Sequence, residues 1–112
     1  MTQSTPLLAL LSGVTADITG NAQLYTGNTQ LAALYINGSL GGGAVTLQAK
    51  PRTNSTYAAG QEPNIDFTPV SGATALVNSE VKLVSIPTNC ELRAILSGSS
   101  GASGVSVALH YQ

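Results

Sequence analysis

The stretch that decides the fold is Leu34–Lys50, LYINGSLGGGAVTLQAK. Apolar and polar residues alternate on both sides of a glycine run, and this period of two is typical of half-buried β-strands. After the glycines, Val45, Leu47 and Ala49 share one phase, so we expect them to face the core. The pattern predicts two antiparallel strands that meet at a tight connection, a β-hairpin.

Two positions compete for the turn between these strands. Asn37-Gly38 is the strongest short hairpin signal in the stretch, but Gly41–Gly43 leads directly into the alternation that starts at Ala44. We favour the triple glycine, which makes Gly38 a β-bulge or a site of close backbone approach. A turn at Asn37-Gly38 would shift the register and change which residues point inward.

Similar alternation recurs through the rest of the chain and predicts an all-β fold. Short strands separated by turn signals at regular spacing are typical of a β-sandwich or small barrel. We predict a single-domain antiparallel β-sandwich of six to nine strands, with a jelly-roll or Ig-like Greek-key topology. A true immunoglobulin domain is not indicated, because tryptophan is absent and there is one cysteine. The later expected strands are Ile65–Val70, Ala73–Val77, Glu80–Ile86, Cys90–Ser97 and Val105–Tyr111.

The first thirty residues have no steady period. We predict that residues 1–30 form an N-terminal arm or edge segment and that residues 31–112 form the sandwich domain. The apolar run Pro6–Leu11 has the composition of a short helix, an extended arm or an edge strand. It lacks a basic segment before it and is too short to span a bilayer, so we expect neither a signal peptide nor membrane association.

Charge is scarce in this chain. Charged residues make up 8% of it, against about 25% in an average domain. The four basic residues are scattered and outnumbered by five acidic ones, which argues against nucleic-acid binding. A surface with so little charge is poorly protected against association. We therefore expect partners to cover much of it.

No motif in the sequence predicts a reaction. His110 and Cys90 are single, and the carboxylates are dispersed, so no metal-ligand spacing is present. Glu62 and Asp66 are a weak candidate for a cation site, and a solvated loop is the better interpretation. The glycines of Gly41–Gly43 lead into a strand rather than a helix, unlike a phosphate-binding loop. We expect no enzymatic activity, cofactor, metal or small-molecule substrate.

Contact surfaces are a stronger expectation than chemistry. Tyr57 lies in Pro51–Pro63, the longest irregular stretch, and tyrosine suits protein interfaces because it combines apolar area with a hydroxyl group. Five aromatic residues in total are too few for a nucleic-acid or carbohydrate stacking platform. The candidate interface residues are Pro6, Leu7, Leu8, Leu10, Leu11 and Tyr57.

Leu34–Tyr111 resembles a recurrent small structural protein of tailed bacteriophages. The resemblance rests on three segments: AVTLQ at Ala44–Gln48, ELRAILSG at Glu91–Gly98, and VSVAL at Val105–Leu109 after a Gly/Ser connection. These are β-strand patterns rather than catalytic signatures, and the resemblance from Leu34 to Tyr111 covers about two thirds of the 112-residue chain.

The resemblance implies a function in the virion. Similar proteins are head decoration (cement) proteins, β-sandwiches that trimerise at capsid threefold axes and clamp neighbouring major-capsid subunits. It implies a homotrimer on the capsid surface, made in the host cytoplasm, with the major capsid protein as partner. The N-terminal arm would lie on a neighbour, so removing residues 1–12 should weaken binding and leave the sandwich folded. The alternative is a tail, connector or fibre-base component, or a receptor-binding knob that uses Pro51–Pro63.

Overall fold

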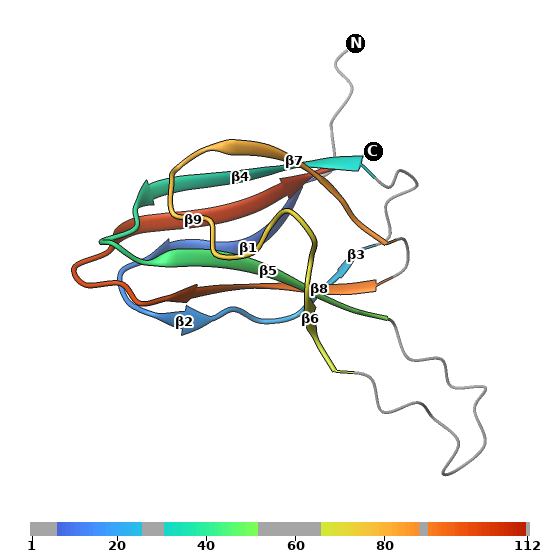
Figure 1. Ribbon diagram of the computed structural model, residues 1–112, viewed down its shortest axis with the longest axis horizontal. Helices are drawn as coiled ribbons and strands as arrows, with labels where there is room; N and C mark the ends of the chain where they lie inside the picture. The colour runs from blue at the N-terminus through green and yellow to red at the C-terminus, as the bar shows by residue number, and fades with distance from the viewer. Residues whose placement is uncertain (1–6, 26–30, 52–65, 88–89, 112) are drawn as a thin grey trace.

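Two antiparallel sheets packed face to face make up the fold (Figure 1). The computed structural model describes residues 7–25, 31–51, 66–87 and 90–111, which contain strands and no helix. The predicted all-β sandwich is therefore confirmed. The first sheet has the order β1 (Leu7–Val14), β9 (Ser103–His110), β4 (Leu31–Ser39) and β7 (Val81–Ser85). In the second sheet, β2 (Ile18–Thr19) and β3 (Gln23–Tyr25) pair with β8 (Cys90–Ser97), which pairs with β5 (Ala44–Pro51), followed by β6 (Thr68–Pro69).

The core lies between the sheets and is built from one phase of each strand. Every buried residue in it is apolar, and the described part of the chain buries no polar or charged residue. Val45, Leu47 and Ala49 face the core as predicted, with exposed fractions of 0%, 0% and 9%. The strand predicted at Cys90–Ser97 is β8, with the same bounds. Alternation therefore predicted correctly which side chains are buried.

The predicted hairpin within Leu34–Lys50 is wrong. The turn is at the triple glycine, where the Gly43 amide donates to the Leu40 carbonyl oxygen at 2.9 Å. However, β4 pairs with β9 and β7, whereas β5 pairs with β8 and β6. The chain thus crosses from the first sheet to the second. Both strands carry one apolar phase, and the crossing lets these two phases face each other across the core.

Gly38 is a site of close backbone approach, as predicted. The register between β4 and β9 shifts between Asn37 and Ser39, and the φ of Gly38 is 97°. A Cβ atom there would lie 2.2 Å from the carbonyl oxygen of Gly104. Only glycine fits this irregularity without displacing the backbone of β9.

The N-terminal apolar run forms an edge strand, one of the alternatives open for it. β1 pairs antiparallel with β9, and the register shifts between Ala9 and Leu11. This bulge inserts Leu10 as an extra residue. As a result the consecutive Leu10 and Leu11 both point inward, each with 5% of its surface exposed. Residues 7–12 therefore belong to the sandwich, which corrects the expectation that removing them leaves it folded.

The strands expected between residues 65 and 86 are shorter than predicted. The strand expected at Ile65–Val70 is reduced to Thr68–Pro69 at the edge of the second sheet, where a proline is tolerated. The expected Ala73–Val77 strand contributes one bridge, between Leu76 and Val45. In the expected Glu80–Ile86 strand, Val84 and Ile86 are the buried residues.

A carboxylate joins two turns at one end of the sandwich. Asp17 accepts hydrogen bonds from the Gly98 and Ser99 amides, at 3.1 and 2.9 Å, and from the Ser99 hydroxyl. The hydrogen bonds from the Ser99 hydroxyl and amide lower the pKa of Asp17. Because the folded-state pKa is below the unfolded value, the stabilisation exists above pH ~4 and is lost as the pH falls through the lowered pKa.

Asp17→Asn is therefore expected to lower the melting temperature at pH 7. The amide is uncharged and offers one acceptor oxygen where the carboxylate offers two. The difference from wild type should shrink as the pH falls below ~4, because protonation removes the same charge from the native side chain. Thermal unfolding of both proteins at several pH values measures this, and a difference that does not change with pH would contradict the account.

Candidate functional site

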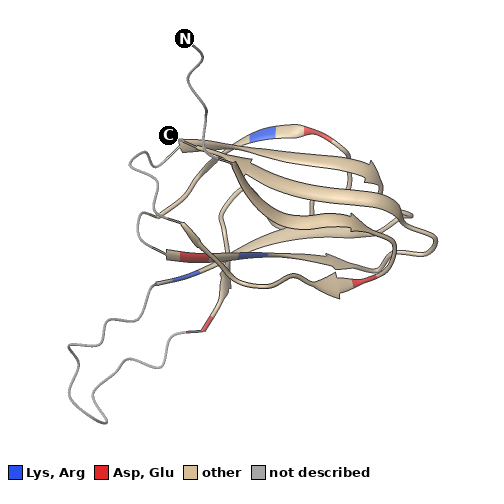
Figure 2. Cartoon of the chain, turned by 180° about the vertical axis from the view of Figure 1, so that it is seen from behind, with Lys and Arg blue, Asp and Glu red and all other residues tan. Residues whose placement is uncertain are grey.

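Among the described residues, the four strands of the first sheet direct no Asp, Glu, Lys or Arg side chain to their outer face. Two rows of paired residues cross all four strands: Leu83, Ala33, His110 and Leu7 form one row, and Val81, Tyr35, Ala108 and Ala9 form the next. In Figure 2, β1, β4 and β9 have no charged residue along their whole length. We call this surface the uncharged face. Its residues are Leu7, Ala9, Leu31, Ala33, Tyr35, Asn37, Val81, Leu83, Ser85, Ser106, Ala108 and His110.

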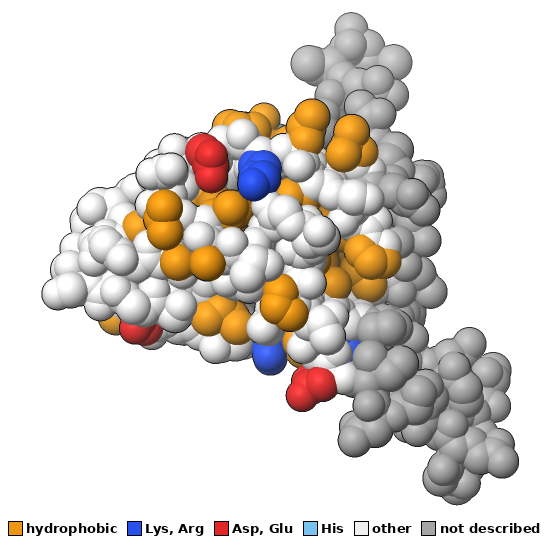
Figure 3. All heavy atoms as spheres, viewed as in Figure 1, with side chains coloured by type: hydrophobic (Ala, Val, Ile, Leu, Met, Phe, Trp, Pro, Cys, Tyr) orange, Lys and Arg blue, Asp and Glu red, His pale blue; other side chains and the backbone are white. Residues whose placement is uncertain are grey.

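Large aliphatic side chains project from the uncharged face. Leu7, Leu31, Val81 and Leu83 have exposed fractions of 56%, 57%, 59% and 66%. Single exposed apolar residues are normal on a protein surface, whereas several on one face mark an association surface. In the view of Figure 3, hydrophobic side chains gather along the upper edge of the molecule, where β4 and β7 run in Figure 1.

An aromatic pair occupies the middle of the uncharged face. The rings of Tyr35 and His110 lie with their centroids 4.8 Å apart at an interplanar angle of 59°. Both residues are partly exposed, and Ala33 and Ala108 beside them leave the rings accessible. Tyrosine is enriched among the residues that dominate protein–protein binding energy. The centre of this face is therefore suited to a protein partner.

The outer face of the second sheet has a different character. Lys50, Glu91 and Arg93 project from it, and Phe67 lies among them. The Arg93 guanidinium carbon lies 4.1 Å from the centroid of the Phe67 ring, and the Lys50 ammonium nitrogen lies 5.6 Å from it. Arg93 Nε also donates to Gln48 Oε1 at 2.8 Å. Lys50 and Arg93 thus contact other side chains of this face, so the two faces of the sandwich differ in what they offer a partner.

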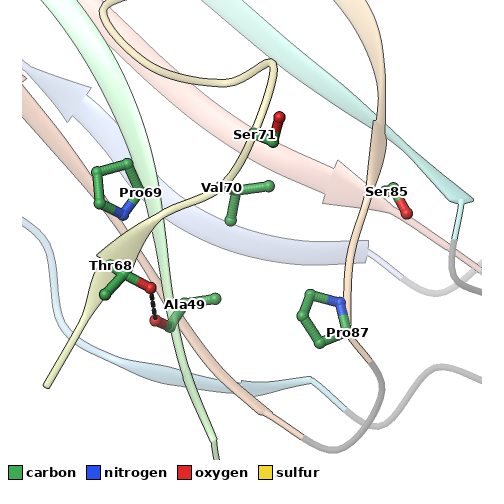
Figure 4. A pocket seen from close by; sticks show the side chains of 7 residues that line it. All are labelled: Ala49, Thr68, Pro69, Val70, Ser71, Ser85 and Pro87. Carbon is green, nitrogen blue, oxygen red and sulfur yellow. Dashed lines mark hydrogen bonds between the residues drawn. The ribbon is translucent and has the colours of Figure 1, made fainter. Parts of the chain in front are cut away.

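A shallow pocket lies beside β6 and offers little chemistry. Its volume is about 310 Å³, and its lining is shown in Figure 4. Thr68 Oγ1 donates to the Ala49 carbonyl oxygen at 3.5 Å. Among the described residues that line it, none is an acid, a base or a thiol, the groups used in proton transfer and nucleophilic attack. The lining residues are Ala49, Thr68, Pro69, Val70, Ser71, Ser85 and Pro87.

The side chains with the most reactive chemistry lie apart from one another. Cys90 is 2% exposed, and its Sγ donates to the Pro87 carbonyl oxygen at 3.1 Å. Burial raises the pKa of this thiol to about 11, and Glu91 adds to the shift. A thiolate therefore does not form near neutral pH. Within residues 7–25, 31–51, 66–87 and 90–111, no three His, Cys, Asp or Glu side chains are grouped so that they could hold a metal ion.

The predicted interface residues divide into three groups. Leu7 is exposed on the uncharged face, and Leu8 packs partly against the core. Leu10 and Leu11 are core residues, so their assignment to an interface is corrected. Pro6 and Tyr57 lie outside the described residues, as does Glu62 of the weak cation-site candidate.

Most of the uncharged face was not predicted from the sequence, and of its residues only Leu7 is among the predicted interface residues. The sequence feature that marks this face is the absence of charged residues at the outward-facing positions of residues 31–37 and 106–110. That signal becomes meaningful only once these strands are known to be neighbours.

Comparison of the chain with protein-family models, curated proteins and solved structures gives no match. The described residues contain no helix long and apolar enough to cross a membrane. A functional proposal must therefore start from the surfaces of the sandwich.

Proposed function

We propose that the protein is a virion structural protein, a head decoration (cement) protein that stabilises contacts between major-capsid subunits on the outer head. The observation that carries this proposal is the uncharged face, a wide sheet surface with exposed aliphatic side chains around an aromatic pair. Such a surface binds a partner by burying apolar area and requires no catalytic group. The phage-protein resemblance supplies the partner, the major capsid protein.

The energetics of the uncharged face favour a multivalent partner. Covering its four exposed aliphatic side chains would contribute about 1 kcal/mol each. No charge on this face would need to be desolvated, so that penalty does not arise. Association itself costs an estimated 4–15 kcal/mol, so one copy alone would bind weakly. Several linked copies on a repeating lattice bind far more tightly, which supports the trimer implied by the resemblance.

Binding to empty heads tests the proposal. Purified protein is mixed with expanded empty heads of the phage whose genome encodes it, and the heads are sedimented. We expect co-sedimentation at a fixed ratio and a higher melting temperature of the heads. Heads that neither retain the protein nor gain thermal stability would refute the cement function. Immunolabelling that places the protein on the tail would support the tail, connector or knob alternative instead.

A further inference from the structure

β7 is the last strand of the first sheet and has one unpaired side. Among the described strands it pairs only with β4. The Ile36 amide donates to the Glu80 carbonyl oxygen at 2.9 Å. Because hydrogen-bonded and non-hydrogen-bonded residue pairs alternate along an antiparallel ladder, this bond fixes which residues of β7 are hydrogen-bonded to β4. Residues 80, 82 and 84 direct their backbone groups toward β4, so Val81, Leu83 and Ser85 direct theirs away from the sheet.

The other described edges are short or covered. β1 is irregular, with two register shifts. A Cβ atom on Gly20 would lie 2.7 Å from the Leu10 carbonyl oxygen, so the chain also packs against this edge at Leu10. In the second sheet, β2, β3 and β6 have two, three and two residues, and β6 includes a proline. β7 has five residues. It is therefore the longest regular edge left open within the described part of the chain.

The side chains of β7 do little to prevent pairing. Val81 and Leu83 are 59% and 66% exposed, and both residue types favour strand packing. Proteins usually block an open edge with charges, proline or a bulge. β7 has one charged residue, Lys82, whose backbone groups point toward β4. The residues that present backbone groups to solvent are uncharged.

We propose that β7 is a self-association site, where β7 of a second copy pairs with it antiparallel about a two-fold axis at Leu83. In this register all five residues pair, with Leu83 opposite Leu83 and Val81 opposite Ser85 of the second copy. An axis at Lys82 would place two lysines directly opposite each other, which is unfavourable. Because Lys82 instead faces Val84, no like charges meet across the contact.

A second copy is the occupant that suits this edge. The contact is self-complementary, as two-fold interfaces are, and it continues the rows of the uncharged face across eight strands. Leu83 and Ala33 of each copy then lie in one row, so two uncharged faces become one surface of twice the area. The contact would link copies of the protein to each other as well as to the capsid, and in this way it deepens the proposed function. Only the role of the contact in the virion rests on the proposed function.

Leu83→Pro tests the edge contact in solution. Proline lacks an amide hydrogen, and the Leu83 amide points away from β4, so the substitution removes no hydrogen bond of the sheet. We expect the mass measured by light scattering to halve, whether wild type is a dimer or a pair of trimers. Circular dichroism should show a folded β-protein. An unchanged mass for the folded variant would overturn the proposal.

Cysteine cross-linking fixes the position of the axis. Paired residues at the axis have Cα atoms about 5.5 Å apart, within the range for a disulfide. Leu83→Cys should therefore give a covalent dimer on oxidation. Val81→Cys is the matched control, on the same face, because two copies of residue 81 would lie roughly 14 Å apart along the strands. The native Cys90 is buried and should not react.

The wild-type oligomeric state and its binding to empty heads separate this proposal from the proposed function, and the cysteine variants test the position of the axis. Cross-linking at residue 81 instead of residue 83 would overturn the axis at Leu83. A wild-type monomer that still binds and stabilises empty heads would overturn the self-association site and leave the cement function standing. A dimer that fails to bind heads would do the reverse.

Discussion

A chain lacking residues 1–12 is expected to lose the sandwich fold rather than a binding arm. The deletion removes most of β1, which pairs with β9, together with Leu10 and Leu11 from the core. Truncating a single core leucine to alanine costs about 2–5 kcal/mol. Removing two whole leucines approaches the 5–15 kcal/mol that holds a typical domain together. The edge of β9 would also be left open.

Circular dichroism and urea denaturation measure this effect. The deleted chain should lack the cooperative unfolding transition of the full chain. A chain lacking residues 2–6 is the control, because it keeps all of β1, and it should retain a cooperative unfolding transition. Leu10→Ala and Leu7→Ala give a finer comparison: about 2–5 kcal/mol is expected for the buried leucine and within about 0.5 kcal/mol for the exposed one. A cooperative transition at the wild-type midpoint after removal of residues 1–12 would contradict the assignment of β1 to the core.

Gly38→Ala is expected to destabilise the protein by roughly 2–4 kcal/mol. One part is backbone strain, because a side chain at a φ of 97° costs about 1–2 kcal/mol. The other part is a collision, since the new Cβ atom would lie 2.2 Å from the Gly104 carbonyl oxygen and 2.6 Å from its carbon. Both atoms belong to the backbone of β9 and cannot move aside as a flexible side chain would.

Gly42→Ala is the matched control for this substitution. Gly42 also has a positive φ, 79°, but a Cβ atom there would meet nothing within 4 Å. Urea denaturation of the two variants should therefore show a loss of only about 1 kcal/mol for Gly42→Ala, from strain alone. Equal losses for the two variants would mean that the contact between β4 and β9 at Gly38 is not as close as the structure has it.

Local pattern predicted burial well and strand neighbours poorly. Alternation predicted the inward residues Val45, Leu47 and Ala49 of β5, because a strand with one buried face must alternate wherever it lies in the fold. The turn at Gly41–Gly43 was also predicted. Pairing of the flanking strands was not, because the same alternation suits a hairpin and a crossing between sheets. The bulge that buries both Leu10 and Leu11 likewise has no signal in a period of two.

The candidate site was harder to predict than the fold. Leu10 and Leu11 were predicted as interface residues from their hydrophobicity alone, but they are buried in the core. The same property favours burial within a chain and between chains. The uncharged face instead combines residues from Leu7 to His110 on four strands. Each contributes little signal by itself. What distinguishes the surface is the lack of charge across neighbouring strands, and that requires the pairing to be known.

The most direct test of the central claim is the affinity of two charge variants for empty heads. Ala108→Asp places a carboxylate in the middle of the uncharged face, and Ala44→Asp places one on the outer face of the second sheet; both alanines are partly exposed. A carboxylate covered by a partner without a counter-charge costs several kcal/mol. We therefore predict that Ala108→Asp weakens binding by about a hundredfold or more and that Ala44→Asp changes it by less than about threefold. Undiminished binding by Ala108→Asp, or a greater loss with Ala44→Asp, would contradict the assignment of the uncharged face as the association surface.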